Sequence, residues 1–383
     1  MQVFWKGRVI DMSINREGAI ANRGNLARMK KLMKRALDGE RLVIGFIGGS
    51  ITQGSLATQP QLCYAYHVYE WWKKTFPKSE FVYVNAGIGG TTSQFGAARV
   101  EEDLLRYRPD FVITEFSVND DSNAHFLETY EGLVRKIYQF ETKPAVLLVH
   151  NVFYHTGGNA QLQHAKIGRH YQLPCVSMQS SIYPEVVAGR IDNRDITPDD
   201  LHPDDAGHEL VASVITYFLD KVLLAVDEVE AEVNEMPMPL TSNSYEACTR
   251  YQNDNYKAAC RGFVPDESEQ EGITDCFKNG WVASEKGAKI SFEIEGTGVS
   301  VQYRKSVKKP APIAEVVVDG DYKNAVRLDA NFYEDWGDKL ELDTITEHMT
   351  AGKHTVEISL VEAHADDAVP FYLVSVIAAE GGN

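Results

Sequence analysis

The sequence predicts an α/β domain followed by an all-β sandwich, and three observations lead to this fold class. Apolar runs of strand length alternate with helical patterns in the first part of the chain. An acidic segment punctuated by Pro and Ser follows, and beyond it apolar and polar residues alternate with a period of two. At 383 residues the chain is also longer than a single hydrophobic core usually grows, which favours two domains.

The first part carries the pattern of a parallel sheet covered by helices. Continuous apolar runs are typical of buried parallel strands and occur at 42–47, 81–84, 111–116 and 145–150, with a weaker fifth strand at 175–177. Helical spacing of apolar residues predicts helices over 26–37, 126–140, 162–171 and 210–222. Asn25 is the expected cap of the first helix and Gly39 its stop. Strands alternating with helices indicate a sheet covered on both faces.

The second part carries the pattern of a β-sandwich. Runs with a period of two cover 289–295, 298–303, 314–321, 353–360 and 371–379, and glycine-containing turns separate them. Several short strands at regular spacing predict a sandwich, in the form of a jelly roll. We therefore expect domains at 1–225 and 246–383, joined by a linker at 226–245. An N-terminal arm at 1–22, with alternating Val3, Trp5 and Val9, offers a surface for self-association or for packing of one domain on the other.

Charge and composition limit the classes of partner and location. The formal net charge of −17 argues against nucleic acid or an anionic membrane as the main partner, because both require a basic surface. The first residues lack the apolar core and cleavage site of a secretory signal, and no later run predicts a membrane span. The five cysteines are odd in number and form no CxxC pair, which favours a reduced, cytoplasmic location without a zinc site.

Function in an open α/β sheet gathers at the carboxyl ends of its strands. Gly48-Gly49-Ser50 follows the first strand, although such a segment alone is more often a tight turn. Residues 85–93 follow the second strand and lack a complete phosphate-binding motif, so we expect this loop to supply a backbone N–H. Asn119 follows the third strand, where it could be a turn residue or donate to an oxyanion.

An aspartate and a histidine close the set just before the last helix. Asp199 lies three residues before His202, so its carboxylate can reach Nδ1 and leave Nε2 to face a serine. The alternative is an acidic helix cap beside a surface histidine. Asp195 and Asp200 compete as the orienting carboxylate, and the spacing favours Asp199. His208, on the following helix, is expected to be a surface or packing residue.

Other conspicuous residues have simpler interpretations. The acidic run over 192–205 lacks the glycine and terminal glutamate of an EF-hand loop, so we expect a solvated face rather than a calcium site. Trp71 and Trp72 are expected to pack in or beside a core. Trp281 and Trp336 could stack on a sugar, but the sandwich core is the more frequent place for tryptophan.

Together, the four strand-end segments resemble the four blocks of the SGNH (GDSL-like) hydrolase family. They are GGSIT, NAGIGGTTS, SVND and DDLHP, in that order, within 41–224. The resemblance implies a flavodoxin-like three-layer α/β/α fold with a shallow, exposed site. Two positions depart from the family pattern: Gly49 stands where many members carry aspartate, and Ser117 where many carry glycine.

The same resemblance implies a role for each matching residue. Ser50 would be the nucleophile, His202 the base, and Asp199 the residue that orients the base. The backbone N–H groups of Ser50 and Gly90 and the side chain of Asn119 would form the oxyanion hole. No metal or organic cofactor is required for this chemistry.

The sequence says less about the ester. The appended sandwich resembles accessory jelly rolls of carbohydrate esterases that deacetylate xylan, so we expect an acetyl esterase acting on acetylated xylan or xylo-oligosaccharides. A short-chain lipid esterase or thioesterase is one alternative, and an inactive carbohydrate-binding protein is another. The expected partner is an acetylated oligosaccharide or polysaccharide, without nucleic acid or membrane, and with homo-oligomerisation left open.

Overall fold

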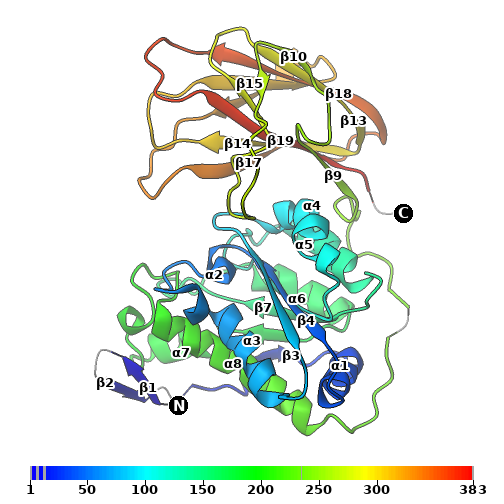
Figure 1. Cartoon of the computed structure of the whole chain (residues 1–383), viewed down its shortest axis with the longest axis vertical. Coiled ribbons are helices and arrows are strands. Elements are labelled where there is room, and N and C mark those ends of the chain that lie inside the picture. The colour runs from blue at the N-terminus through cyan, green and yellow to red at the C-terminus, as the bar shows by residue number, and fades with distance from the viewer. Residues whose placement is uncertain (1, 6–7, 12–13, 234, 382–383) are drawn as a thin grey trace. The chain divides into compact units, whose positions relative to one another are not determined.

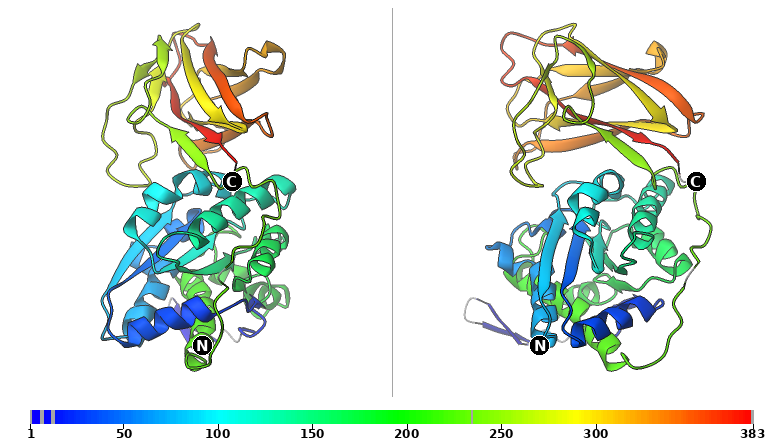
Figure 2. Two further views of the ribbon diagram at one scale, coloured as in Figure 1. Left: turned by 90° about the vertical axis from the view of Figure 1, so that its right-hand side faces the viewer. Right: turned by 45° about the vertical axis from the view of Figure 1, so that its right-hand side comes forward.

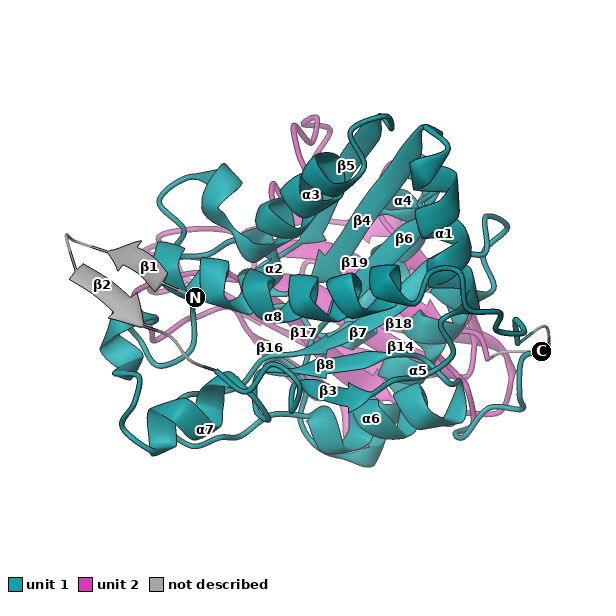
Figure 3. Ribbon diagram, turned by 90° about the horizontal axis from the view of Figure 1, so that it is seen from below, with its two compact units in different colours: residues 1–241 teal, residues 242–383 magenta. Residues whose placement is uncertain are grey.

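The computed structural model describes residues 2–5, 8–11, 14–233 and 235–381. The chain divides into two compact units, Met1–Thr241 and Ser242–Asn383, and each has its own hydrophobic core (Figures 1 and 3). The division falls inside the segment 226–245 that the sequence marks as a linker. Val3, Trp5 and Val9 of the N-terminal arm lie outside the part whose side chains are described.

A six-stranded sheet in the order β3-β8-β7-β6-β4-β5 forms the centre of unit 1. Five of these strands are parallel and confirm the predicted ones: β4 (Leu42–Gly48), β5 (Phe81–Gly87), β6 (Phe111–Glu115), β7 (Ala145–His150) and β8 (Cys175–Ser177). The order of these five from one edge, by chain position, is 2-1-3-4-5, as in flavodoxin-like folds. A short antiparallel edge strand, β3 (Ile20–Asn22), was not predicted.

Helices form two groups against this sheet (Figure 3). The first group contains α1 (Ala27–Leu37), α3 (Tyr64–Thr75) and α8 (Asp205–Leu224), which share a core with one face of the strands. The second contains α4 (Ser93–Asp103), α5 (Ala124–Tyr138) and α6 (Gln161–His170). Two short helices, α2 (Ser50–Gln53) and α7 (Ile182–Val187), lie in connections. The predicted helices are confirmed, with ends that shift by a few residues.

The acidic segment after α8 is tied to the rest of unit 1 by ion pairs. Glu230 pairs with Arg23 at 3.0 Å and with Lys30 at 3.1 Å. The pKa of the Glu230 carboxyl is lowered to about 2, chiefly by the hydrogen bond from Arg23. Glu232 pairs with Arg28 at 2.8 Å. These acidic side chains therefore hold the segment against the rest of unit 1. The composition of the segment alone does not distinguish this arrangement from a solvated linker.

Unit 2 consists of two antiparallel sheets, as the alternating pattern predicts (Figure 2). One sheet contains β10 (Ala259–Arg261), β13 (Lys289–Gly296), β18 (Gly352–Glu362), β15 (Ile313–Val318) and β16 (Val326–Asp329). The other contains β11 (Val264–Pro265), β12 (Trp281–Ala283), β19 (Phe371–Ala379), β14 (Gly298–Lys305) and β17 (Lys339–Thr346), with β9 (Cys248–Tyr251) also on β19. The five predicted strands are β13, β14, β15, β18 and β19. The others are short or, like β17, lack a clean alternation of buried and exposed residues.

The tryptophans divide between core and surface. Trp72 and Trp281 are buried, and Trp71 is half-buried with its indole N–H donating to Asp220. The expectation that Trp336 joins the sandwich core is wrong, because 57% of it is exposed and its indole N–H donates to Glu334. Trp336 lies in the connection between β16 and β17, where no strand periodicity fixes the direction of a side chain.

Candidate active site

The turn from β4 into α2 carries Ser50. Gly49 precedes the helix and Ser50 is its first residue, so the Ser50 backbone N–H is among those that the helix itself leaves unused. Ser50 is 7% exposed. In the sheet order, β4 lies between β5 and β6, so the carboxyl end of β4 lies at the switch point where α/β sheets bind ligands.

His202 connects Ser50 with Asp199. Its Nε2 lies 2.8 Å from the Ser50 Oγ, and its Nδ1 lies 2.6 Å from the Asp199 Oδ2. We assign the tautomer in which Nδ1–H donates to the carboxylate and the serine hydroxyl donates to Nε2, because each atom then has a partner of the right kind. The structure thus brings together the three residues that the sequence singles out as nucleophile, base and orienting carboxylate.

The Asp199 carboxylate is held by its own turn. Its Oδ1 accepts the backbone N–H groups of Leu201 at 3.0 Å and His202 at 2.7 Å. Partial burial raises the pKa of Asp199, but the hydrogen bonds from the His202 ring and these N–H groups outweigh burial, so the pKa lies below its ordinary value. Asp199 therefore stays ionised beside the imidazole.

Asp200, the competing carboxylate, points to other partners. Its carboxylate accepts from Arg194 at 2.8 Å and from Asn193, both in the turn ahead of the site. Its backbone has a φ of 68°, a left-handed conformation that is unusual for a residue other than glycine. Asp195 has no hydrogen bond to His202 among the described residues. The geometry agrees with the spacing argument that favours Asp199.

The glycine loop after β5 contacts the side chain of Gln53. The Gly89 N–H donates to the Gln53 Oε1 at 2.6 Å, so this N–H is already used. Gly90 follows with a φ of 68°, which a side chain would make strained, and it is exposed. The sequence did not identify Gln53, since a glutamine in the turn after the serine carries no motif of its own.

Asn119 lies at the end of the turn after β6. Its backbone N–H donates to the Phe116 carbonyl at 3.0 Å. The side-chain oxygen is buried and has no hydrogen-bond partner among the residues that the structure describes. With the oxygen turned inward, the Asn119 amide nitrogen is the end of the side chain available to another group.

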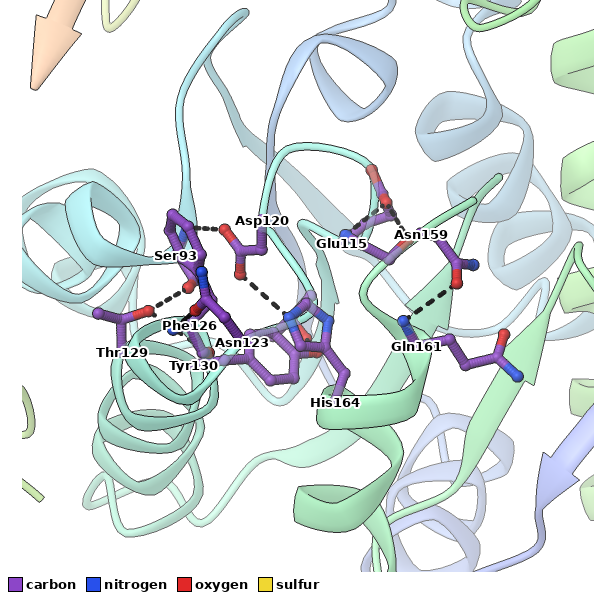
Figure 4. Close-up of polar contacts among 12 residues, drawn as sticks. Ser93, Glu115, Asp120, Asn123, Phe126, Thr129, Tyr130, Asn159, Gln161 and His164 are labelled. Carbon is purple, nitrogen blue, oxygen red and sulfur yellow. Dashed lines mark hydrogen bonds and ion pairs between the residues drawn. The ribbon is translucent and has the colours of Figure 1, made fainter. Parts of the chain in front are cut away.

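The buried Asp120, directly after Asn119, contacts the start of α4 and a histidine of α6 (Figure 4). One carboxylate oxygen accepts the Ser93 N–H at 2.9 Å, at the start of the helix after the glycine loop. The other lies 3.0 Å from the Nε2 of His164, which is buried and stacks on Tyr130 with ring centroids 3.7 Å apart. This buried network fixes the glycine and asparagine segments relative to each other.

Glu115 lies beneath the turn that carries Ser50 and is fully buried. Its backbone carbonyl accepts the Gly49 N–H at 3.3 Å, and its carboxylate accepts the backbone N–H of Ser117 at 3.2 Å and the hydroxyl of Ser117 at 3.0 Å. Burial raises the pKa of Glu115 to about 7, although hydrogen bonds from Ser117 and Asn151 oppose the shift. Ser117, a departure from the family pattern, is therefore a hydrogen-bond donor to a buried carboxyl.

The described residues contain no group of three or more His, Cys, Asp or Glu side chains placed to hold a metal ion. Among the same residues, no helix combines the length and apolar character needed to cross a membrane.

Comparisons with known proteins identify a family and several relatives. Residues 46–210 match the GDSL-like lipase/acylhydrolase family. An acetylxylan esterase of Geobacillus stearothermophilus is 31% identical over 130 residues, which are 28% of this chain and 56% of that protein. The chain thus matches little more than half the length of this esterase.

One crystal structure matches this chain over nearly its whole length. It is a two-domain esterase active on acetylated mannans, co-crystallised with mannopentaose, and it is 66% identical with a TM-score of 0.94. The match covers 97% of this chain and 100% of that one. A second crystal structure of such an esterase is 67% identical, with the same coverage and TM-score. The chain therefore belongs to the GDSL-like lipase/acylhydrolase family and is a carboxylic ester hydrolase.

Proposed function

We propose that the chain is a serine esterase that removes O-acetyl groups from carbohydrate through Ser50, His202 and Asp199. The observation that carries the proposal is the continuous hydrogen-bonded path from the Ser50 hydroxyl through His202 to Asp199, at 2.8 Å and 2.6 Å. A hydroxyl, an imidazole and a carboxylate in this order form the arrangement that makes serine nucleophilic.

The reaction follows from these groups. His202 Nε2 takes the proton of Ser50 as its Oγ attacks the ester carbonyl, and the Ser50 N–H, the Gly90 N–H and the Asn119 amide donate to the oxyanion. His202 then gives this proton to the sugar oxygen as the bond between that oxygen and the carbonyl carbon breaks, which leaves an acetyl group on Ser50. Water activated by His202 releases acetate and restores the enzyme. Asp199 orients the ring and stabilises its charge at both stages.

The substrate class rests on the relatives. The sequence favoured acetylated xylan, on the architecture of the appended sandwich. The whole-length likeness at 66% identity is to an esterase active on acetylated mannans, whereas the likeness to an acetylxylan esterase is 31% over 130 residues. We therefore favour acetylated manno-oligosaccharides or mannan as substrate, with acetylated xylan second.

Acetate release tests both parts of the proposal. The wild-type chain is incubated with acetylated galactoglucomannan, acetylated glucuronoxylan and their oligosaccharides, and the Ser50→Ala variant serves as the matched control. We expect faster release from the mannan substrates and none above background from the variant. Equal release by the variant would overturn the serine mechanism, and faster release from xylan would reverse the choice of substrate.

Two other classes of function are separated by simple probes. For a lipid esterase or thioesterase, activity on p-nitrophenyl esters would rise from acetyl to octanoyl, whereas we expect it to fall. For an inactive carbohydrate-binding protein, a fluorophosphonate would leave folded wild-type protein unlabelled, whereas we expect it to label Ser50.

A further inference from the structure

Gly49, immediately before the proposed nucleophile, is the first of the two departures from the family pattern. Its φ of −87° lies outside the left-handed region, so a positive φ is not the reason for glycine at this position. The residues that surround the position supply another reason.

The space beside Gly49 is filled by Asn119. A Cβ added to Gly49 would lie 2.2 Å from the Asn119 Oδ1, 2.8 Å from its Cγ and 3.1 Å from its Nδ2. Cβ atoms in real structures essentially never approach within 3.0 Å of such atoms. All three atoms of the amide group are crowded, so exchanging its oxygen and nitrogen would not remove the conflict.

Asn119 has little else to hold its amide in place. Its backbone N–H is fixed by Phe116, but its side-chain oxygen makes no hydrogen bond among the described residues. The position of the amide therefore depends on packing, and the bare Cα of Gly49 is the surface on which its oxygen lies.

We propose that Gly49 is a positioning residue for the oxyanion hole, which rests on the role proposed above for Asn119. The missing side chain lets the Asn119 amide lie against the backbone that carries Ser50, with its nitrogen farther from the Gly49 Cβ position than its oxygen. Any side chain at this position, including the aspartate common in the family, displaces the amide in this chain.

Displacement of the Asn119 amide should weaken binding of the transition state and not of the substrate. An oxyanion-hole donor must lie about 2.7–3.1 Å from the place that the oxyanion will occupy, so a small displacement removes most of its effect. A donor used only in the transition state changes kcat and leaves KM nearly constant. A general loosening of the site would instead change KM and stability as well.

A double-mutant cycle tests whether Gly49 acts through Asn119. Gly49→Ala, Asn119→Ala and the double variant are compared with wild type on p-nitrophenyl acetate. We expect about a 100-fold lower kcat for each single variant. The double variant should lie within about threefold of Asn119→Ala alone, because two changes that act through one group do not multiply.

Gly45→Ala, within the strand β4 that leads to Gly49, is the matched control. Its new Cβ would meet the terminal Cδ1 of Leu104 at 2.6 Å, and that side chain can move. We expect its kcat to stay within about twofold of wild type, because only packing remote from the site is disturbed. If Gly45→Ala lowered kcat as much as Gly49→Ala, the specific role of Gly49 would be overturned.

The remaining outcomes separate the two proposals. Losses that multiply in the double variant, or a Gly49→Ala variant with wild-type kcat, overturn the role of Gly49 and leave that of Asn119 intact. Wild-type kcat in Asn119→Ala overturns the role of Asn119 as an oxyanion donor, and with it the inference about Gly49. If Gly49→Ala does not fold, the double variant should recover the melting temperature of Asn119→Ala to within about 3 °C, and failure to do so also counts against the inference.

Discussion

Aspartate–histidine pairs occur in two regions of unit 1, and they differ in what lies beyond the pair. In the Asp199–His202 pair the atoms are 2.6 Å apart, both side chains are partly exposed, and the second ring nitrogen faces the Ser50 hydroxyl. In the Asp120–His164 pair they are 3.0 Å apart and both side chains are fully buried. The second nitrogen of His164 is buried and has no partner among the described residues.

A third pair, in unit 2, extends the comparison. His354 Nδ1 lies 2.6 Å from Asp319, and its Nε2 donates to the Thr350 carbonyl at 2.9 Å. Carboxylate and ring thus lie within hydrogen-bond distance in all three pairs. What distinguishes the first pair from both others is a hydroxyl at the far ring nitrogen, and the following predictions test this distinction.

The largest effect is expected for His202→Ala. Without the base, Ser50 keeps its proton, and we expect a loss of kcat on the order of 10⁶-fold on p-nitrophenyl acetate. The melting temperature should stay close to that of wild type, because His202 is partly exposed. A kcat within tenfold of wild type would remove His202 from the mechanism.

Asp199→Asn should lower kcat less than His202→Ala does, but still by a large factor. The amide can stabilise the wrong tautomer of His202, and we expect kcat to fall by about 10⁴-fold while KM changes little. Steady-state kinetics between pH 6 and 9 would measure this. An unchanged kcat would show that the carboxylate does not orient the ring.

Asp120→Asn applies the same substitution to the buried pair and should give the opposite result. We expect unfolding free energy to fall by about 2 kcal/mol, since a buried acceptor for His164 is replaced by a donor. We expect kcat to fall by less than about tenfold, because one oxygen remains for Ser93. Urea unfolding and kcat measured together would separate the pairs, and a larger loss of kcat with unchanged stability would contradict the assignment.

The smallest effect is expected for His354→Ala in unit 2. We expect unchanged kcat and a loss of less than about 1 kcal/mol of stability. Asp319 raises the pKa of His354, so the pair stabilises the fold below the ordinary pKa of histidine and loses this effect as pH rises through the raised value. The variant should therefore differ more from wild type in melting temperature at pH 5.5 than at pH 8.5.

The sequence predicts those parts of the site that local patterns encode. The i, i+3 spacing of Asp199 and His202 and the position of Ser50 after an apolar strand depend on a few neighbouring residues. The Gln53–Gly89 and Asp120–His164 contacts join residues 36 and 44 positions apart. No periodicity or motif marks such partners, because only the packed fold brings them together.

The strands of the fold also divide into those that a local pattern predicts and those that it does not. Buried parallel strands have continuous apolar runs, so β4, β6 and β7 could be predicted, whereas the three-residue β3 is too short to show a period. In unit 2, the alternating β13 was predicted and the irregular β17 was not. Trp336 shows that hydrophobic character does not determine burial where a connection sets the direction of the side chain.

Because the pKa of Glu115 is raised in the folded chain, folding near pH 6 is coupled to proton uptake at this residue. An exposed glutamate titrates near 4.3, whereas Glu115 in the fold titrates at about 7. At pH 6 the unfolded carboxyl is ionised and the folded one is protonated, so folding takes up about one proton at this residue. Calorimetric unfolding heats should therefore vary with the ionisation enthalpy of the buffer. At pH 6, folding thus transfers a proton from the solvent to a carboxyl beneath the turn that carries Ser50.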